Sequence, residues 1–221
     1  MGGAQVAEKV LARCGRAAVR KFRRSDLAER LEWLPYKDPF NAHLNFPLAT
    51  FMDRERWLWT RTVNAGRMYF AIVDEYARLV GEISLRDIEP VGKTSRLGIH
   101  LASNKLGEGY GREALEALLS YYFRNMKWEA MYLDVAAFNV RALTLYEHMH
   151  FEHIAPFWRQ TTAPDVPVFT DEQYAPIRRF FRHNGNTVEV LHYDMLLSRE
   201  VYLETHGAEK PCPPERKAVK T

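Results

Sequence analysis

The stretch LGIHLASNKLGEGYGREALEALL, residues 97–119, decides the fold of this chain. Its first five residues, 97–101, are mostly apolar and are typical of a β-strand. Glycines follow at positions 107, 109 and 111, and the residues after them place apolar side chains at helical spacing. The stretch therefore predicts a strand, a glycine loop and a helix over about 111–125. A tight turn needs one glycine, whereas three at alternate positions favour a loop whose backbone approaches a ligand.

This glycine loop is predicted to bind the pyrophosphate of a cofactor. Glycine lets backbone amides approach phosphate oxygens, and the start of the following helix adds unpaired amides and the positive end of its dipole. Lys105 and Arg112 would add positive charge, while the side chain of Glu108 is expected to point outward. A nucleoside-triphosphate loop does not fit, because the required Gly-Lys-Ser/Thr is missing.

A dinucleotide-binding fingerprint is the main rival interpretation of the same loop. Residues 109–114, GYGREA, match G-x-G-x-x-G/A, and Asp134 ends the next strand about where a ribose-binding acid is expected. The strands before the loop look antiparallel, however, and only one strand–helix–strand unit follows it. A Rossmann-type domain needs more such units, so this interpretation is the less favoured one.

Around this stretch the chain is predicted to form one α+β domain with a mixed sheet. We expect strands at 18–23, 68–73, 79–85, 97–101, 131–136, 151–157 and 188–197, and helices opened by Ser25-Asp26 and at 52–64, 111–125 and 139–149. Residues 1–17 are expected to be a loose or helical leader and 18–203 a single domain with an insertion at 161–186. The tail over 204–221 holds little to bury and is expected to be mobile.

Composition and charge narrow the class of protein. The 221 residues suffice for one large domain, and no apolar run approaches the roughly 18–20 residues that cross a bilayer. The two cysteines, Cys14 and Cys212, make no disulfide framework or metal cluster, so we expect a reducing, cytoplasmic setting. The net charge is +3, and the basic stretch over 13–24 has no companion nucleic-acid motif. We interpret that stretch as a solvated strand face and expect no membrane or nucleic-acid partner.

A second motif follows the strand at 131–136, in the sequence FNVRALTLYEHMHF, residues 138–151. Its residues Asn139, Ala142, Tyr146, Glu147 and Phe151 match the pattern Asn-x-x-Ala-x-x-x-Tyr-Glu-x-x-Gly-Phe, with His150 in place of glycine. The loop over 106–111 matches Gln/Arg-x-x-Gly-x-Gly/Ala, with Leu106 in the first place. In both motifs the chain resembles the GNAT superfamily of acetyl-CoA-dependent acetyltransferases. It resembles most the branch of the ribosomal-protein N-terminal and diamine acetyltransferases.

The resemblance implies the GNAT fold. This is a mixed, mostly antiparallel sheet of six to seven strands, splayed between the strands at 97–101 and 131–136, with helices on both faces. The pantetheine arm of the co-substrate acetyl-CoA would lie in the gap. The groups implied to hold acetyl-CoA are Ile99, Leu101, Leu106, Gly107, Gly109, Tyr110, Gly111, Arg112 and Asn139. His150 stands where glycine usually ends the helix in a left-handed turn, so strain is expected there.

The activity implied is an N-acetyltransferase that moves an acetyl group to a primary amine by direct transfer in a ternary complex. The amine would belong to a protein N-terminus or a small molecule. An acyl-CoA-binding module without activity is the alternative that the departures at Leu106, Arg96 and His150 leave open.

Acetyl transfer needs an acid for the departing thiolate, a polarised carbonyl and a base. The resemblance implies that Tyr146 points its hydroxyl at the CoA sulfur as the acid. The amide near Leu101 would polarise the carbonyl. His100 and Glu82 are the candidate bases, because histidine titrates near neutral pH and Glu82 lies on the neighbouring strand. Arg96 stands where many relatives carry an acid. The alternatives are polar side chains satisfied within the sheet and a tyrosine that only packs.

The acceptor amine remains open at this stage. The aromatic-rich insertion at 161–186 is predicted to cover the acceptor site, with a dimer contact as an equal alternative and hence a possible homodimer. Within it, Pro176 would start a short helix that Gly185 ends. Aromatic side chains near the first helix suit a peptide terminus or an aromatic amine, and Asp171-Glu172 suits a polyamine. The histidines at 148, 150 and 153 lack the spacing of a metal site, so no metal is expected.

Overall fold

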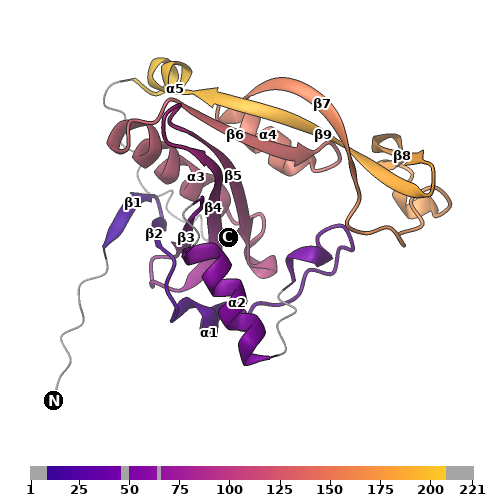
Figure 1. Ribbon diagram of the computed structural model, residues 1–221, viewed down its shortest axis with the longest axis horizontal. Helices are drawn as coiled ribbons and strands as arrows, with labels where there is room; N and C mark the ends of the chain where they lie inside the picture. The colour runs from indigo at the N-terminus through magenta and orange to yellow at the C-terminus, as the bar shows by residue number, and fades with distance from the viewer. Residues whose placement is uncertain (1–8, 46–49, 64–65, 208–221) are drawn as a thin grey trace, which may run out of the picture.

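The computed structural model describes residues 9–45, 50–63 and 66–207 and shows an α+β fold built on one mixed sheet (Figure 1). Within those residues the sheet has nine strands in the order β1-β2-β3-β4-β5-β6-β9-β7, with β8 paired to β9. The strands are β1 Val10–Cys14, β2 Ala17–Lys21, β3 Met68–Val73, β4 Leu79–Glu89, β5 Thr94–Leu101, β6 Ala130–Ala136, β7 Glu152–Gln160, β8 Phe181–Asn184 and β9 Thr187–Ser198. The β5–β6 pair is parallel and the other neighbouring pairs are antiparallel.

The helices cover both faces of the sheet, as predicted. They are α1 Asp26–Leu31, α2 Phe51–Thr62, α3 Tyr110–Ser120, α4 Val140–His148 and α5 Arg199–His206, and a π-helical turn at Tyr121–Asn125 extends α3. The apolar stripe of α3, which includes Leu115 and Leu118, packs with residues of α4 and α5 into the large core on one face. Leu27 of α1 and Leu58 of α2 pack on the opposite face. The mixed, mostly antiparallel sheet of the GNAT fold is therefore confirmed.

The predicted gap in the sheet lies between the ends of β5 and β6. Their parallel pairing runs from Thr94↔Ala130 to Leu97↔Leu133, where it stops within the described residues. On the other side, β5 stays paired with β4 as far as Leu101, and β6 stays paired with β9 as far as Ala136. The last four residues of β5 and the last three of β6 therefore flank an opening in the sheet.

The N-terminal region differs from the prediction of a loose leader. Residues 10–14 form β1, which pairs with β2, so the sheet begins inside the predicted leader. The basic stretch is only partly a solvated face: Arg13, Lys21, Arg23 and Arg24 are exposed, but the Arg20 guanidinium is buried against Asp26 at 2.7 Å. The same carboxylate accepts a hydrogen bond from the Arg23 amide, and Ser25 makes no side-chain cap. The first amides of α1 donate to backbone carbonyls instead, Asp26 to Arg23 and Leu27 to Arg24.

The insertion at 161–186 holds two single 3-10 turns, at Glu172–Tyr174 and Arg178–Phe180, followed by β8. No helix runs from Pro176 to Gly185, so that prediction is wrong. Gly185 instead occupies the tight turn of the β8–β9 hairpin with φ 57°. The two loop residues are Gly185 and Asn186, because Asn184 pairs with Thr187, and a Gly-Asn dipeptide between two strands is typical of a hairpin.

The C-terminal tail was predicted to be mobile from Glu204, but residues 204–206 belong to α5. Ser198 caps this helix by accepting a hydrogen bond from the Val201 amide at 3.2 Å. The rest of the predicted tail, 208–221, lies outside the described residues, as do residues 1–8 of the predicted leader.

Candidate active site

The glycine loop adopts the conformation that an anion site needs. Gly107 and Gly109 have φ of 82° and 94°, in the region that side chains disfavour. Gly109 is the N-cap of α3, and no side chain caps that helix start. Counting from the start of α3, the first backbone amide that donates a hydrogen bond within the helix is that of Glu113, which donates to the Gly109 carbonyl. The amides of Tyr110, Gly111 and Arg112 are therefore left for a ligand at the positive end of the helix dipole.

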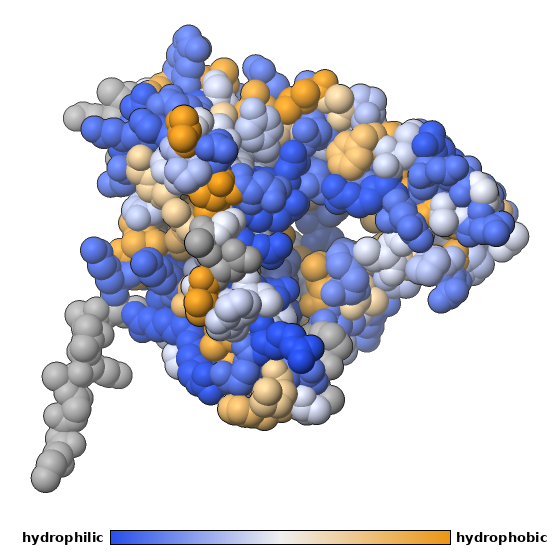
Figure 2. Space-filling model, viewed as in Figure 1, coloured by the Kyte–Doolittle hydropathy of each residue, from blue (hydrophilic) through white to orange (hydrophobic). Residues whose placement is uncertain are grey.

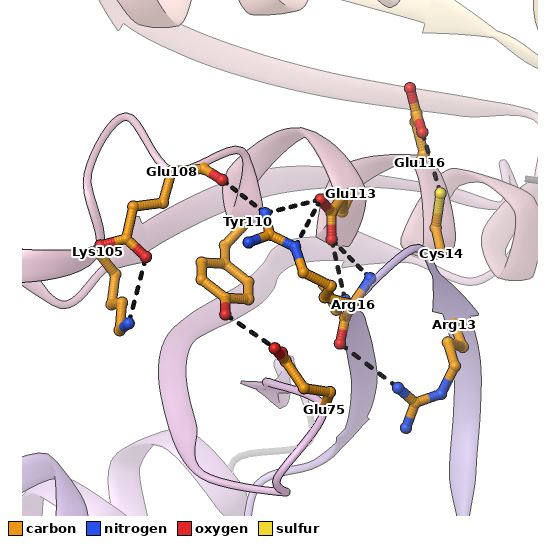
Figure 3. A network of polar contacts seen from close by, with 10 residues as sticks. Arg13, Cys14, Arg16, Glu75, Lys105, Glu108, Tyr110, Glu113 and Glu116 are labelled. Atoms are coloured by element: carbon orange, nitrogen blue, oxygen red, sulfur yellow. Dashed lines mark hydrogen bonds and ion pairs between the residues drawn. The ribbon is translucent and has the colours of Figure 1, made fainter. Parts of the chain in front are cut away.

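Arg16 holds this loop from the turn between β1 and β2 (Figure 3). Its Nη2 donates to the Glu108 carbonyl at 2.6 Å and to Glu113 Oε1 at 3.0 Å. The other oxygen of Glu113 accepts hydrogen bonds from the backbone amides of Arg16 and Ala17 at 2.8 and 3.1 Å. One arginine thus ties the loop to the first turn of α3. The resemblance described above implies Gln or Arg at position 106, where this chain has Leu106, and the loop is instead contacted by Arg16.

The other side chains near the loop are already paired. Lys105 lies 3.2 Å from the Glu108 carboxylate, and Arg112 lies 2.9 Å from Glu116 on the exposed side of α3. The Tyr110 ring is buried under the Arg16 guanidinium, 4.5 Å from the ring centroid, and its hydroxyl donates to Glu75. Tyr110 can therefore serve a cofactor only through its backbone amide.

Strand β5 turns a row of backbone groups toward the gap. The Ala102 amide donates to the Val80 carbonyl of β4 at 2.9 Å. Because amide directions alternate along a strand, the amides of Ile99 and Leu101 point away from β4, toward the gap. The Leu101 carbonyl points the same way and accepts a hydrogen bond from the Tyr36 hydroxyl. An extended amide-bearing ligand in the gap would find strand-like partners here.

Strand β6 and α4 supply the other wall of the gap. The Asn139 side chain caps α4 by accepting from the Ala142 amide at 3.2 Å, which leaves its NH₂ group free for a carbonyl. Tyr146 is 8% exposed, packs against Phe151, and its hydroxyl has no hydrogen-bond partner in the described part of the chain. Burial raises the pKa of Tyr146, with the Asp134 charge adding to the rise, so the hydroxyl keeps its proton. His150 ends α4 at φ 65°, the strained conformation expected of it.

Glu82 and His100 face each other on β4 and β5, on the sheet face opposite Ile99 and Leu101. His100 Nε2 lies 2.8 Å from Glu82 Oε2, and the Tyr69 hydroxyl donates to the same oxygen at 2.7 Å. Arg30 Nε donates to Glu82 Oε1 at 3.1 Å. Burial raises the pKa of Glu82, but His100, Arg30 and Tyr69 together outweigh that effect and hold the pKa below its usual value.

This pairing assigns different roles to the two candidate bases. Glu82 is 1% exposed and both of its oxygens are occupied, so it is a poor direct base for an incoming amine. The Nε2 of His100 must carry a hydrogen to bond a carboxylate, which leaves the lone pair on Nδ1. The Arg30 Nη2 lies 3.4 Å from Nε2 and adds positive charge without displacing that bond. His100 is thus the exposed member of the pair, and Glu82 orients it.

Asp134 is the residue that the dinucleotide interpretation assigned to a ribose, but in the structure it forms ion pairs with arginines. Arg86 and Arg159 each donate to its carboxylate at 2.7 Å, and Arg96 lies 3.4 Å away. Burial raises the pKa of Asp134. The hydrogen bonds and charges of Arg159 and Arg86 outweigh burial and lower the pKa to about 2. Arg96, which stands where relatives often have an acid, also bonds Asp194 at 2.5 Å. A carboxylate engaged by three arginines is not available to a ribose.

Sequence patterns did not reveal Arg16, Arg30 or Tyr69, because each meets its partner on another element. Tyr36 was expected near the acceptor as one of the aromatic residues after the first helix, and its hydroxyl donates to the Leu101 carbonyl. Asn139 and the glycines, in contrast, were found because their roles are local. Among the described residues, no group of three or more His, Cys, Asp and Glu side chains is arranged to hold a metal ion. None of the described helices has the length and apolar character needed to cross a membrane.

A sheet split between two parallel strands, with a glycine loop and an uncapped helix start at the opening, is the architecture of an acyl-CoA-dependent acyltransferase. Residues 16–152, more than half of the chain, match the family model described as an acetyltransferase (GNAT) domain. The chain therefore belongs to the GNAT acetyltransferase family. The Rossmann-type alternative is thereby overturned.

The chain is also similar to spermidine N-acetyltransferases of Vibrio cholerae. A curated spermidine N(1)-acetyltransferase is 29% identical over 82 residues, which span 37% of this chain and 47% of the relative, or about half its length. The crystal structure of spermidine N-acetyltransferase in complex with CoA and spermine has a TM-score of 0.64 at 18% identity, covering 85% of this chain and 98% of that chain. A second structure, of the spermidine/spermine N-acetyltransferase with manganese ions, has a TM-score of 0.58 at 20% identity and covers 88% and 98%. The two structures share the fold of this chain.

Proposed function

We propose that this protein transfers the acetyl group of acetyl-CoA to a primary amine, directly and within a ternary complex. One observation carries the proposal: unpaired amides of β5 line the gap, and unpaired amides of α3 lie at its end. The first set suits the amide groups of a pantetheine arm, and the second suits a pyrophosphate. The two sets match the two parts of a single ligand.

Acetyl-CoA would be held mostly by main-chain groups. The amides from Gly107 to Arg112 would bind the pyrophosphate, and those of Ile99 and Leu101 would bind the pantetheine arm. The free NH₂ group of Asn139 would donate to the arm from the opposite wall. Arg16 fits this scheme as a positioning residue, since it fixes the loop through the Glu108 carbonyl and the Glu113 carboxylate.

The acyl-transfer step would use one group for each of its requirements. His100 takes the proton of the incoming ammonium group on Nδ1, and the neutral nitrogen attacks the thioester carbon. The Leu101 amide stabilises the negative charge that develops on the carbonyl oxygen. As the carbon–sulfur bond breaks, Tyr146 gives its proton to the sulfur and is reprotonated by the second proton that the acylated nitrogen loses, while His100 releases the first proton to solvent. The products are the N-acetylated amine and CoA with a free thiol.

The proposed function is tested by two measurements on the purified chain. Acetyl-CoA should raise the melting temperature, whereas NAD should leave it unchanged, because binding to the folded state alone stabilises it. A panel of primary amines, small molecules and peptides with free N-termini, should then release thiol from acetyl-CoA. Stabilisation without thiol release for any amine would favour the alternative of an acyl-CoA-binding module, and no stabilisation would refute both.

Replacing Arg16 with alanine is expected to raise the KM for acetyl-CoA about tenfold, equivalent to about 1.4 kcal/mol, with kcat within twofold of wild type. The loop would lose its link to the first turn of α3, so its amides would converge less well on the pyrophosphate. Steady-state kinetics with acetyl-CoA as the varied substrate check this. Arg24→Ala removes another arginine–glutamate pair, of 2.6 Å to Glu55, far from the loop and serves as the matched control. Full recovery in Arg16→Lys would contradict the positioning role, because lysine keeps the charge without the forked geometry.

Replacing His100 with glutamine should lower kcat/KM for the amine by roughly 10²–10⁴-fold, the usual value of a general base. The KM for acetyl-CoA should change little, since the ring lies on the opposite face from Ile99 and Leu101. The chain offers a matched control in His153, whose Nε2 lies 2.9 Å from Glu147 on the surface. If His100→Gln and His153→Gln retain the same turnover, His100 is not the base.

A further inference from the structure

A cavity of about 160 Å³ adjoins the gap at the end of β6. Its walls come from the segment over 40–43, the end of β6, the end of β7, and the facing residues Val190 and His192 of β9. Figure 2 shows the molecule hollowed between the body of the sheet and the arm that carries β7, β8 and β9. The cavity therefore lies beside the wall of the gap that the end of β6 and Asn139 form.

The segment from Leu34 to Leu44 spans the gap and forms one wall of the cavity. At one end, the Tyr36 hydroxyl donates to the Leu101 carbonyl and the Ser103 hydroxyl donates to the Leu34 carbonyl. At the other end, the Phe40 ring packs on Phe138, with centroids 5.1 Å apart. This segment links β5 to the end of β6, so a group attached to the acceptor amine would meet the cavity directly.

The cavity lies on the same face of the sheet as His100. Alternation along β9 puts Met195 and Leu197 in the core beneath α3 and turns His192 to the other face. The same alternation along β5 turns His100 away from that core. An amine nitrogen beside His100 and a substituent in the cavity would therefore lie on one side of the gap.

The lining of the cavity is aromatic and lacks acidic groups. Phe40 and Phe138 form apolar walls, and Phe181 packs against both rings from behind. None of the lining residues among the described ranges is Asp or Glu. The polar groups at the rim include His43, whose Nδ1 contacts the Phe40 carbonyl at 2.9 Å, and Thr162. The wall thus offers ring surface and neutral hydrogen-bonding groups.

The charge around the cavity does not favour a cation. The nearest fixed positive charge is Arg159, which lines the cavity and bonds Asp134 at 2.7 Å. Burial lowers the pKa of His192, as does Arg159, so its ring is neutral at neutral pH. The acidic pair considered for a polyamine lies elsewhere in the insertion: Asp171 bonds Gln173, and Glu172 bonds Arg178. An ammonium ion in the cavity would meet an arginine and no free carboxylate.

We infer that this cavity receives an uncharged aromatic group carried by the acceptor amine, an inference that rests on the proposed function. Its volume suits a single ring, since a protein cavity of about 150 Å³ holds benzene. The spermidine acetyltransferases act, by their names, on an acceptor with several ammonium groups, and such an acceptor needs carboxylates for recognition. The acceptor of this chain thus differs in chemical class from the acceptors of those relatives. It carries one ammonium group, which lies at His100, and one ring, which lies beside Phe138.

The test compares acceptors of the full-length protein with acetyl-CoA held at saturation. 2-Phenylethylamine should have a kcat/KM at least tenfold above that of spermidine and of ethylamine, which lacks the ring. The peptide Phe-Gly-Gly, compared with Gly-Gly-Gly, distinguishes an aromatic N-terminal residue from a free aromatic amine as the source of the ring. A kcat/KM for spermidine equal to or above that of both ring-bearing acceptors overturns the inference but leaves the proposed function intact.

Two variants connect the preference to the cavity. Phe138→Ala should lower kcat/KM for 2-phenylethylamine about tenfold and leave that for ethylamine unchanged. Trp59→Ala, at an exposed aromatic residue of α2, is the matched control and should change neither. Thr162→Asp places a carboxylate at the exposed rim and should raise kcat/KM for spermidine about tenfold, which keeps the inference testable if Phe138→Ala does not fold. An unchanged ring preference in both variants would refute the cavity as the determinant.

If no amine is acetylated, the proposed function is refuted. The inference about the cavity is then tested by measuring ligand binding. In the presence of CoA, 2-phenylethylamine should raise the melting temperature of the protein more than spermidine does. An equal or smaller rise than with spermidine refutes the inference as well.

Discussion

Replacing Tyr146 with phenylalanine is expected to lower kcat by roughly 10²–10⁴-fold while the affinity for acetyl-CoA stays within about twofold of wild type. Tyr146 is 8% exposed, its hydroxyl has no hydrogen-bond partner in the described part of the chain, and burial raises its pKa. It therefore remains protonated at neutral pH, and a departing thiolate in the gap would be its natural acceptor. Because the ring and its packing on Phe151 are kept, the loss would be chemical rather than structural.

The measurements are kcat from thiol release and the dissociation constant of acetyl-CoA from calorimetry. Tyr202→Phe is a suitable control, since Tyr202 is also a buried tyrosine, 4% exposed, and stacks on Phe123 away from the gap. A Tyr146→Phe protein with normal turnover would remove the acid role and leave the residue as a packing element. A loss of acetyl-CoA affinity equal to the loss of kcat would point instead to a damaged gap.

Replacing Gly109 with valine is expected to weaken acetyl-CoA binding at least 100-fold, or about 2.7 kcal/mol. Gly109 has φ 94°, a backbone conformation that a β-branched residue adopts only at a cost of about 1–3 kcal/mol. A Cβ atom there would also lie 3.3 Å from the Arg16 guanidinium, which holds the loop. The loop would have to move, and the amides at the start of α3 would no longer converge on one anion.

Calorimetric titration with acetyl-CoA checks this prediction. The control is Gly185→Val, which places the same side chain at φ 57° in the β8–β9 turn, where an added Cβ meets nothing within 4 Å. Both variants place valine at a positive φ, so both are expected to lose stability. Only Gly109→Val should also lose binding of acetyl-CoA. Binding that survives in Gly109→Val would rule out the loop as the pyrophosphate site.

Local sequence carried the prediction of the loop, of the α3 start and of the turn at the end of α4. Glycines at 107 and 109 and the replacement at His150 constrain backbone angles directly, and the structure has positive φ at all three. Asn139 was predicted to begin a helix, and its side chain caps α4. The split sheet was implied by the resemblance of the two motifs to the GNAT superfamily.

The errors in the sequence prediction arose where partners are distant. Arg20 and Asp26 form a buried ion pair, although the basic stretch around Arg20 looked like a solvated face. β1 was missed because a short edge strand, here VLARC, shows no clear alternation of apolar and polar side chains. The helix predicted from Pro176 was wrong because the chain instead forms β8 and turns at Gly185 and Asn186 into β9.

By itself, the sequence determined the fold family and the backbone conformation of the glycine loop, because both depend on residues that act within a few positions of each other. Only the tertiary structure decided which charged side chains serve the site. Arg30 meets Glu82 across 52 positions, and Arg16 meets Glu113 across 97. Burial and pairing of a charge depend on which elements pack together, so an arginine beside the reacting groups looks the same in the sequence as one in solvent. The aromatic cavity has the same origin, because four separate segments must come together before it exists.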